Sequence, residues 1–390
     1  MNRSFATVED MLDALDPREP VYCIYPQAYL RGARRFVEGF PGRVLYAVKA
    51  NDHPQILRLL SEAGVDAFDC ASVAEIALVR QHCPTATPFY MTPARLRGAA
   101  TEAFDEFGVR HFLIDDPSGL ERLADEIDPA ACVIFARMLA RHDSAMMDFS
   151  AKFGAPPLEI PGLLQDIANR GAEPALAFNV GSSVTSPSAY LSSLEQAAEQ
   201  LSRLPFPVRL LDIGGGFPLP YPGFDVPPLE DYFNAVAAFR PQLPLAEGGQ
   251  LLAEPGRALS APGLSAVVEV LLRKGNRIYI NDGMFGIFWE LRFKGHKHYH
   301  CRVLRDGSPH AGDETASFRL FGPTCDGSDA LPEPFDLPAD IRPGDHIEFG
   351  RIGAYSLAGR TRFNGFYSDN VVTITGGEPP GVELPHADTE

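Results

Sequence analysis

The 390-residue chain lacks the features that mark several classes of protein. No apolar run is long enough to cross a bilayer, and the first 20 residues carry five acidic side chains without an apolar core, so neither membrane insertion nor a secretory signal is expected. Basic residues are outnumbered, 34 to 51, and the net charge of −17 argues against general nucleic-acid binding. We expect a cytoplasmic protein that binds neither a membrane nor nucleic acid.

Paired cysteines and nucleotide-binding glycines are also missing. The six cysteines form no CxxC pair and no metal-ligand spacing, so we expect reduced thiols and no bound metal. No GxGxxG motif is present, and a nicotinamide-binding fingerprint is therefore absent.

The order of apolar runs predicts a barrel followed by a second domain. The chain is too long for one ordinary core. From about residue 21 to residue 254, eight short apolar runs alternate with helical segments, and eight such units fit a (β/α)8 barrel better than an open doubly wound sheet, which the spacing alone leaves open. The candidate strands are Val44–Val48, Ala67–Cys70, Pro88–Met91, His111–Ile114, Val133–Met138, Pro174–Val180, Val208–Ile213 and Leu251–Glu254.

After Arg257 the pattern changes to β-branched and aromatic runs separated by Gly, Pro and Asp, which indicates an antiparallel β domain. We therefore expect a barrel over residues 21–260 and a β domain over residues 261–376, to which residues 1–20 could also belong. The remaining residues, 377–390, are rich in Gly, Pro and acids and are expected to form a loose tail.

Lys49 follows the strand candidate Val44–Val48, and the next residues, Asn51–Pro54, indicate a turn into a helix. A lysine at the carboxyl end of such a strand faces the crevice where α/β proteins bind ligands. Partial desolvation there favours the neutral amine, which attacks a carbonyl to form a Schiff base. A surface lysine at a strand end is the alternative.

Three glycines, Gly214, Gly215 and Gly216, follow the strand candidate Val208–Ile213. Backbone without side chains approaches an anion closely, and successive N–H groups in such a loop form a phosphate nest. Ser182, after another strand candidate, could supply a hydroxyl to the same anion. A tight turn is the alternative for the glycines, and a turn residue for the serine.

Glu254 ends the last barrel strand candidate, with Gly256 and Arg257 just after it. A buried glutamate beside a heteroaromatic nitrogen keeps that nitrogen protonated and makes the ring an electron sink. A plain ion pair between Glu254 and Arg257 is the alternative.

The polar stretch Gly322–Asp329 lies in the β half. Cys325 could move a proton there and Asp326 could hold a cationic substrate, whereas a buried cysteine and an Asx turn are the alternatives. Tyr355 would ordinarily be a strand tyrosine.

Eight motifs occur in the order found in a known family: YAVKAN, FDCAS, SAKFG, DIGGGFP, AEPGR, GPTCDG, GAYS and FNGF. They resemble those of the alanine-racemase-type (fold type III) pyridoxal-phosphate-dependent decarboxylases, which act on ornithine, diaminopimelate and arginine. The resemblance covers roughly residues 21–370, and the last three motifs are most similar to the ornithine/lysine branch.

The resemblance implies pyridoxal 5'-phosphate as the cofactor, with Lys49 holding it as a Schiff base and Glu254 pairing with its pyridine nitrogen. Further residues that the resemblance implies for the cofactor site are Asp69, Arg137, Lys152, Asn179, Ser182, Gly214, Gly215, Gly216, Gly256, Arg257 and Tyr355.

For the substrate, an amino acid, the resemblance implies that Cys325 reprotonates the carbanion carbon and that Asp326 meets the distal amine. Phe363, in the FNGF motif, is implied as a further substrate contact. In the family Cys325 and Asp326 would reach across from a partner subunit, so a head-to-tail homodimer with shared active sites is expected.

Two positions depart from the family pattern. Asn179 stands where a histidine usually stacks on the cofactor ring, and an amide cannot carry the charge of an imidazolium. Lys294 stands where ornithine-type members usually have an aspartate that sets specificity, within a basic cluster over Arg292–His300. That cluster is either a solvated charge run or a pocket for a substrate whose far end is anionic or uncharged.

We therefore expect an α-decarboxylase for an L-diamino acid of the ornithine or lysine kind, which releases carbon dioxide and leaves a diamine. The same chemistry on an anionic or modified side chain, as in diaminopimelate or a biosynthetic intermediate, is the first alternative. A racemase is disfavoured because Cys325 and Asp326 belong to the decarboxylase pattern. A catalytically silent regulatory homologue is a further alternative, which Asn179 leaves open.

Overall fold

The computed structural model describes residues 3–142, 144–147, 150–293, 295 and 298–382. The chain forms two compact units. The barrel unit comprises Ala33–Leu219 and Val226–Ala258, and the β unit comprises the described residues up to Gly32, from Pro220 to Asp225 and from Leu259 onward. None of the helices in the described part of the chain has the length and apolarity to cross a membrane.

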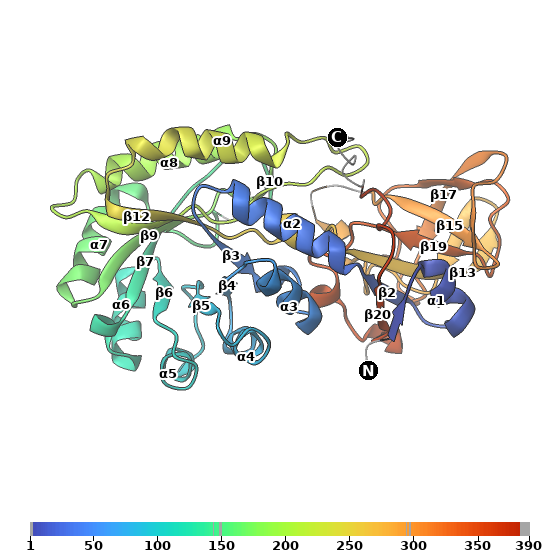
Figure 1. Cartoon of the computed structure of the whole chain (residues 1–390), viewed down its shortest axis with the longest axis horizontal. Coiled ribbons are helices and arrows are strands. Elements are labelled where there is room, and N and C mark those ends of the chain that lie inside the picture. The colour runs from blue at the N-terminus through green and yellow to red at the C-terminus, as the bar shows by residue number, and fades with distance from the viewer. Residues whose placement is uncertain (1–2, 143, 148–149, 294, 296–297, 383–390) are drawn as a thin grey trace, which may run out of the picture. The chain divides into compact units, whose positions relative to one another are not determined.

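The eight predicted strands all form, and they close into one parallel barrel in the order β3, β4, β5, β6, β7, β9, β11 and β12 (Figure 1). This confirms the predicted (β/α)8 fold and excludes the open sheet. The strands are β3 (Arg43–Ala47), β4 (Ala67–Cys70), β5 (Thr87–Tyr90), β6 (His111–Ile114), β7 (Val133–Met138), β9 (Glu173–Phe178), β11 (Val208–Asp212) and β12 (Leu245–Ala253).

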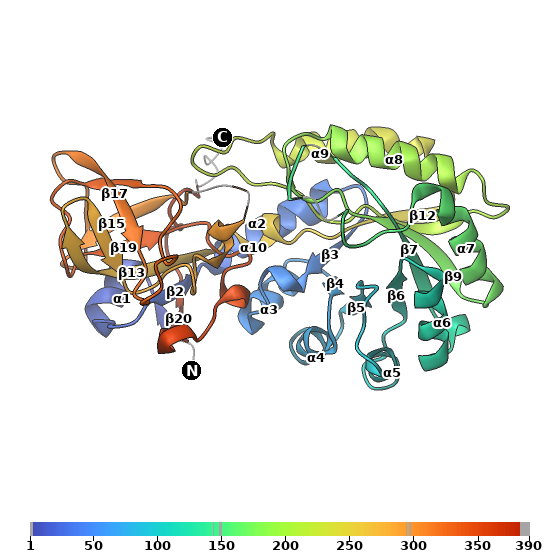
Figure 2. The same cartoon turned by 180° about the vertical axis from the view of Figure 1, so that it is seen from behind.

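Helices alternate with these strands and lie outside them, as both faces of the molecule show (Figures 1 and 2). Local signals begin several of them: the Ser72 hydroxyl accepts the Glu75 N–H at α4, and Asp116 caps α6 just before Pro117. The helices are α2 (Pro26–Gly39), α3 (Pro54–Glu62), α4 (Val73–His82), α5 (Ala99–Asp105), α6 (Pro117–Glu126), α7 (Ile160–Asn169), α8 (Ser188–Leu201), α9 (Leu229–Phe239) and α10 (Arg257–Ser260).

The barrel core comes from alternate residues of its strands, because successive side chains of a strand point to opposite faces. A short antiparallel pair, β8 (Ala145–Met147) with β10 (Ser182–Val184), is added beside the barrel. The buried residues of one central cluster are Leu45, Ala67, Phe89, Met91, Leu113, Phe135, Ala175, Ala177 and Leu252.

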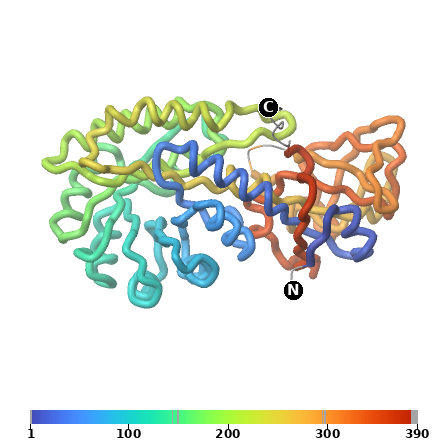
Figure 3. The backbone as a smooth tube through the Cα atoms, in the orientation of Figure 1, coloured from blue at the N-terminus to red at the C-terminus, as the bar shows by residue number. Residues whose placement is uncertain are grey.

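The β unit contains a mostly antiparallel ten-stranded sheet and helix α1 (Val8–Leu15), which confirms the predicted β domain. Its first and last strands, β1 and β20, run side by side in parallel, so segments from the two halves of the chain lie in one sheet (Figure 3). The strands are β1 (Arg3–Phe5), β2 (Val21–Ile24), β13 (Leu264–Lys274), β14 (Arg277–Ile280), β15 (Cys301–Arg305), β16 (Ser308–His310), β17 (Thr315–Phe321), β18 (Phe335–Pro338), β19 (His346–Phe349) and β20 (Val371–Ile374).

The limits of the units differ from the expected ones at several places, one of which is Pro220–Asp225, a part of the β unit. Residues 21–32 belong with the β unit, because β2 pairs with β13 and with β20. The expected loose tail is held in its first part, where Glu378 forms an ion pair with Arg31 and its side chain is only 8% exposed. Residues 383–390 of that tail lie outside the described residues.

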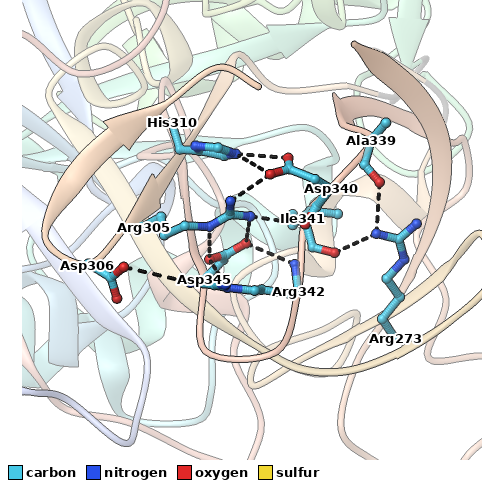
Figure 4. Close-up of polar contacts among 9 residues, drawn as sticks. All are labelled: Arg273, Arg305, Asp306, His310, Ala339, Asp340, Ile341, Arg342 and Asp345. Carbon is cyan, nitrogen blue, oxygen red and sulfur yellow. Dashed lines mark hydrogen bonds and ion pairs between the residues drawn. The ribbon is translucent and has the colours of Figure 1, made fainter. Parts of the chain in front are cut away.

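A charged network organises one turn of the β unit (Figure 4). Arg305, at the end of β15, donates to Asp340 and to both carboxylate oxygens of Asp345 at 2.6–2.9 Å. The hydrogen bonds from Arg305 and from His310 lower the pKa of Asp340 to about 2. Because Asp345 is only 2% exposed and also accepts the Arg342 backbone N–H at 2.9 Å, the network holds residues 340–345 against the β15–β16 hairpin.

A second network, around Glu348, joins the N-terminal segment to the sheet. The fully buried Glu348 carboxylate accepts hydrogen bonds from Tyr25 and Ser265, each at 2.6 Å, and from Arg302 at 2.7 Å. Arg302 also pairs with Glu9 of α1 at 2.8 Å. Each donor comes from a different segment, so this one carboxylate links four parts of the unit.

We predict that Glu348→Ala lowers the free energy of unfolding of the β unit by about 2–4 kcal/mol, because it leaves three donors, one of them charged, without their acceptor. Guanidinium unfolding measures the change. The control is Glu333→Ala, which removes an exposed carboxylate and should alter stability little. Equal stability of the two variants would contradict the role given to Glu348.

Candidate active site

Lys49 lies in a 3₁₀ turn, Val48–Ala50, directly after β3, where the sequence analysis placed it. Its Nζ atom is 2.6 Å from Oδ2 of Asp69, at the end of the neighbouring strand β4. Asp69 is 2% exposed, whereas the Lys49 side chain is 46% exposed, so the expected desolvation of the lysine is only partial. Two adjacent parallel strands thus place an amine and a buried carboxylate in contact at their carboxyl ends.

Two further cations, Arg137 and Lys152, lie near one aromatic ring, that of Phe153. The Arg137 guanidinium lies 5.7 Å and the Lys152 ammonium 4.8 Å from the centre of the Phe153 ring. The segment that carries Lys152 and Phe153 is tied to β7, because the Ala155 N–H donates to the Arg137 carbonyl at 2.8 Å. The Gly154 N–H donates to Asp115 at 3.0 Å.

The glycine triplet after β11 has no room for side chains. A Cβ atom at Gly214 would lie 2.5 Å from the Phe178 carbonyl oxygen, and one at Gly215 would lie 2.7 Å from the Glu254 carbonyl oxygen. The φ angles of Gly214 and Gly216, 71° and 101°, also favour glycine. The loop is therefore packed backbone against backbone at the ends of β9, β11 and β12.

Ser182 and Asn179 belong to the neighbouring turn after β9. Ser182 is 8% exposed and begins β10. The Asn179 side-chain oxygen accepts the Gly181 N–H at 2.9 Å, so the amide stabilises the turn that leads to Ser182. Asn179, which departs from the family pattern, therefore stabilises the backbone of the turn Asn179–Ser182.

Glu254 follows β12, and its N–H donates to the Gly214 carbonyl at 2.8 Å. Burial raises the pKa of Glu254 well above its usual value, with Asp212 and Asp69 adding to the effect and Lys49 opposing it. The pKa of the fully buried Asp212 is also raised by burial, to about 7. Three carboxyl groups therefore lie at this end of the barrel with one lysine.

Pro255, Gly256 and Arg257 follow Glu254. Arg257 is 6% exposed and begins the short helix α10. The Pro255 carbonyl accepts the Ala47 N–H at 3.2 Å, which ties this segment to the end of β3. Lys49 and Arg257 thus follow two backbone segments that are bonded to each other.

The remaining predicted site residues belong to the β unit. Cys325 is exposed, and its N–H and Sγ lie 3.2 and 3.4 Å from the side-chain oxygen of Asn364. Hydrogen bonds from the hydroxyl and N–H of Ser328 lower the pKa of Asp326. Phe363, 39% exposed, adjoins Asn364, so the CDG and FNGF motifs lie together.

Tyr355 also lies in the β unit, in the left-handed backbone region with φ 53°. It belongs to a loop, and the ordinary strand position considered for it is wrong. Lys294 lies outside the described residues.

Sequence reasoning gave no role to several residues that shape these loops. The Asp212 carboxylate accepts the Gly214 N–H at 2.8 Å, and the Tyr190 hydroxyl donates to the Gly215 carbonyl at 2.7 Å. In the β unit, Asp329 accepts the N–H and hydroxyl of Thr324. The position of Asp212, directly before Ile213 and the glycines, is the one signal that could have indicated its role.

Comparison with known proteins gives consistent results. A family model described as "Pyridoxal-dependent decarboxylase, pyridoxal binding domain" matches residues 28–261. The lysine/ornithine decarboxylase of Selenomonas ruminantium is 31% identical over 83% of this chain and 81% of its own length. Antizyme inhibitor 2 of Xenopus laevis is 30% identical over 86% of this chain and 77% of its own length.

Among solved structures, the lysine/ornithine decarboxylase of Vibrio vulnificus complexed with putrescine superposes with a TM-score of 0.80 and 26% sequence identity. The alignment covers 94% of this chain and 97% of that one.

We predict that Asp212→Asn reduces the pH dependence of stability of the cofactor-free protein. The folded-state pKa of about 7 exceeds the ordinary carboxyl value of about 3.9, so the folded state binds more protons and the free energy of unfolding falls as the pH rises through that window. Between about pH 5 and pH 7 the wild-type protein should lose on the order of 2 kcal/mol more than the variant.

Urea unfolding at each pH measures this difference. Asp105→Asn, which changes an exposed carboxylate of the same unit, serves as the control and should follow the wild-type curve. If Asp212→Asn keeps the wild-type pH dependence, protonation of Asp212 does not cause the loss of stability between pH 5 and pH 7.

Proposed function

The chain belongs to the pyridoxal-dependent decarboxylase family, and from that premise we propose that it removes the α-carboxylate of an L-diamino acid of the ornithine or lysine kind. The products are carbon dioxide and a diamine. The observation that carries the proposal is the contact between Lys49 and the buried Asp69 at the carboxyl ends of β3 and β4. Lys49 lies at the same end of the barrel as Glu254, whose pKa the Asp69 charge raises and the Lys49 charge lowers.

The residues present fit pyridoxal phosphate. A loop in which Gly214 and Gly215 have no room for side chains presents bare backbone, as phosphate binding requires. A largely buried carboxyl group with a raised pKa, Glu254, suits the nitrogen of a pyridine ring, with which it can share a proton. The cofactor, when bound, supplies an electron sink for the electrons that the departing carboxylate leaves.

In this proposal each barrel residue has a defined task. Lys49 binds the cofactor through its amine, and Asp69 orients that amine. Glu254 holds the proton at the pyridine nitrogen, while Ser182 and Arg257 bind the phosphate together with the glycine loop. Asn179 stabilises the turn that leads to Ser182, because its side-chain oxygen accepts the Gly181 N–H.

The β unit would supply the proton and the substrate contact. Cys325 delivers the proton to the α carbon, and Asp326 binds the distal amine of the substrate. We propose that these residues act in the barrel of a partner subunit, so that a homodimer shares its two sites. The exposure of Cys325, in contrast to the four buried cysteines, supports a role at a surface that another subunit covers.

A non-catalytic function is the second candidate, because antizyme inhibitor 2 of Xenopus laevis is 30% identical to the chain. A protein of that kind would not need Lys49, Glu254 and Cys325 together. The retention of all three supports the enzyme.

We predict that the purified protein binds pyridoxal phosphate on Lys49, because its amine contacts Asp69 at the end of the barrel that also carries the glycine loop and Glu254. An absorption band near the visible edge and borohydride reduction followed by peptide mapping test this. Lys49→Ala should lack both the band and carbon dioxide release, whereas Lys274→Ala, which removes a lysine of the β unit, should keep both. Labelling of a different lysine would refute the assignment.

We predict a shared-site dimer. Mixing inactive Lys49→Ala and Cys325→Ala subunits should restore up to about a quarter of the wild-type activity, because half of the chains enter hybrids that own one intact site of two. Subunit exchange is followed independently with two affinity tags. Proven exchange without recovery of activity would show that each site belongs to one chain.

A further inference from the structure

The three carbonyl groups of the glycine loop Gly214–Gly216 each accept a hydrogen bond from the barrel unit. The Glu254 N–H donates to the first carbonyl at 2.8 Å, and the Val184 N–H donates to the third at 3.0 Å. The hydroxyl of Tyr190, on α8, donates to the second at 2.7 Å. Because the C=O and the N–H of a trans peptide unit point in opposite directions, each bonded carbonyl also fixes the direction of the next N–H.

The same three peptide units carry the N–H groups of Gly215, Gly216 and Phe217. Within the described part of the chain, none of these three N–H groups donates to a protein acceptor. Consecutive N–H groups of this kind bind an anion such as a phosphate. The hydrogen bonds to the carbonyls therefore hold three donors in a defined direction.

Tyr190 is the one side chain among the three groups that donate to these carbonyls. The other two donors are backbone N–H groups, which almost any residue would supply. Tyr190 is fully buried, and burial raises the pKa of its hydroxyl well above the usual value, so the group remains a donor at every pH at which the protein is folded. The direction of the middle peptide unit thus depends on the identity of this residue.

Aromatic packing fixes the position of the Tyr190 hydroxyl. The Tyr190 ring stacks on Phe217, with the ring centres 4.9 Å apart and an interplanar angle of 25°. It also meets the Tyr232 ring edge to face, with a distance of 6.1 Å between the ring centres. These contacts involve the ring alone, so a phenylalanine at position 190 would keep the packing and remove only the hydrogen bond to Gly215.

We propose that Tyr190 is a positioning residue for the cofactor phosphate, because its hydroxyl holds the peptide unit between Gly215 and Gly216 with the N–H directed to the phosphate. The inference rests on the proposed function, in which the glycine loop binds the phosphate of pyridoxal phosphate. Without the hydroxyl, the Gly215 carbonyl loses its donor, and this peptide unit is free to turn its N–H away from the phosphate.

The test compares two ligands that differ only in the phosphate. Cofactor-free wild-type protein and Tyr190→Phe are each equilibrated by dialysis with pyridoxal phosphate and with pyridoxal. Tyr190→Phe should raise the Kd for pyridoxal phosphate by about 5- to 30-fold, because one buried hydrogen bond is lost, and should change the Kd for pyridoxal by less than about twofold. The phosphorus NMR signal of the bound cofactor should shift in the variant.

Tyr25→Phe is the matched control. It also removes a buried tyrosine hydroxyl, which donates to Glu348 of the β unit at 2.6 Å and has no contact with the glycine loop. We expect Tyr25→Phe to keep the wild-type Kd values and the wild-type phosphorus signal. Urea unfolding of the cofactor-free proteins measures the loss of stability in each variant separately.

The outcomes separate the inference from the proposed function. If Tyr190→Phe binds pyridoxal phosphate as tightly as the wild type, or if Tyr190→Phe weakens pyridoxal to the same extent, Tyr190 does not position the phosphate. Equal weakening in Tyr25→Phe would likewise assign the effect to general stability and overturn the inference. In each of these cases the wild-type protein still binds the cofactor, whereas absence of binding by the wild type would overturn the proposed function as well.

Discussion

Closure of the barrel between β12 and β3 is the constraint on which the site depends. The seam pairs Leu252 with Arg43 and Ala253 with Val44, and a further hydrogen bond joins Ala47 to Pro255. A parallel sheet left open here would expose unpaired backbone groups at two edges, and closure removes both. It also brings the lysine that follows the first strand to the glutamate that follows the last one, so that the site exists only in the closed barrel.

The electrostatics at that end of the barrel follow from the same closure. Asp69, Asp212 and Glu254 arrive from three strands, and the cations that oppose their mutual repulsion are Lys49 and Arg137. Such a cluster costs stability when every carboxyl group is ionised. Burial raises the pKa of Asp212 and of Glu254, and the charges of the neighbouring carboxylates raise it further. In the proposed function, a protonated ring nitrogen bound there would offset part of this negative charge.

The β unit uses its buried charges differently. Glu348 and Asp345 are each satisfied by arginines and by further donors, and they fix the sheet and its turns. On the exposed side, Arg292 lies over the Phe285 ring, and the Asp326 carboxylate accepts the N–H and the hydroxyl of Ser328.

The sequence by itself determined the eight barrel strands, the β character of the second half and the motifs of the site, because strand periodicity and glycine-rich turns are local properties. Even there, the same signals could not place Val21–Ile24 in the β unit, since that choice depends on pairing with β13 and β20. Only the tertiary structure decided that the Asp212 and Glu254 carboxyl groups lie close together, that Asn364 contacts Cys325 39 positions away, and that Arg292 stacks on Phe285. These contacts join residues that lie far apart in the sequence. They stabilise the protein only after the barrel has closed and the sheet has formed.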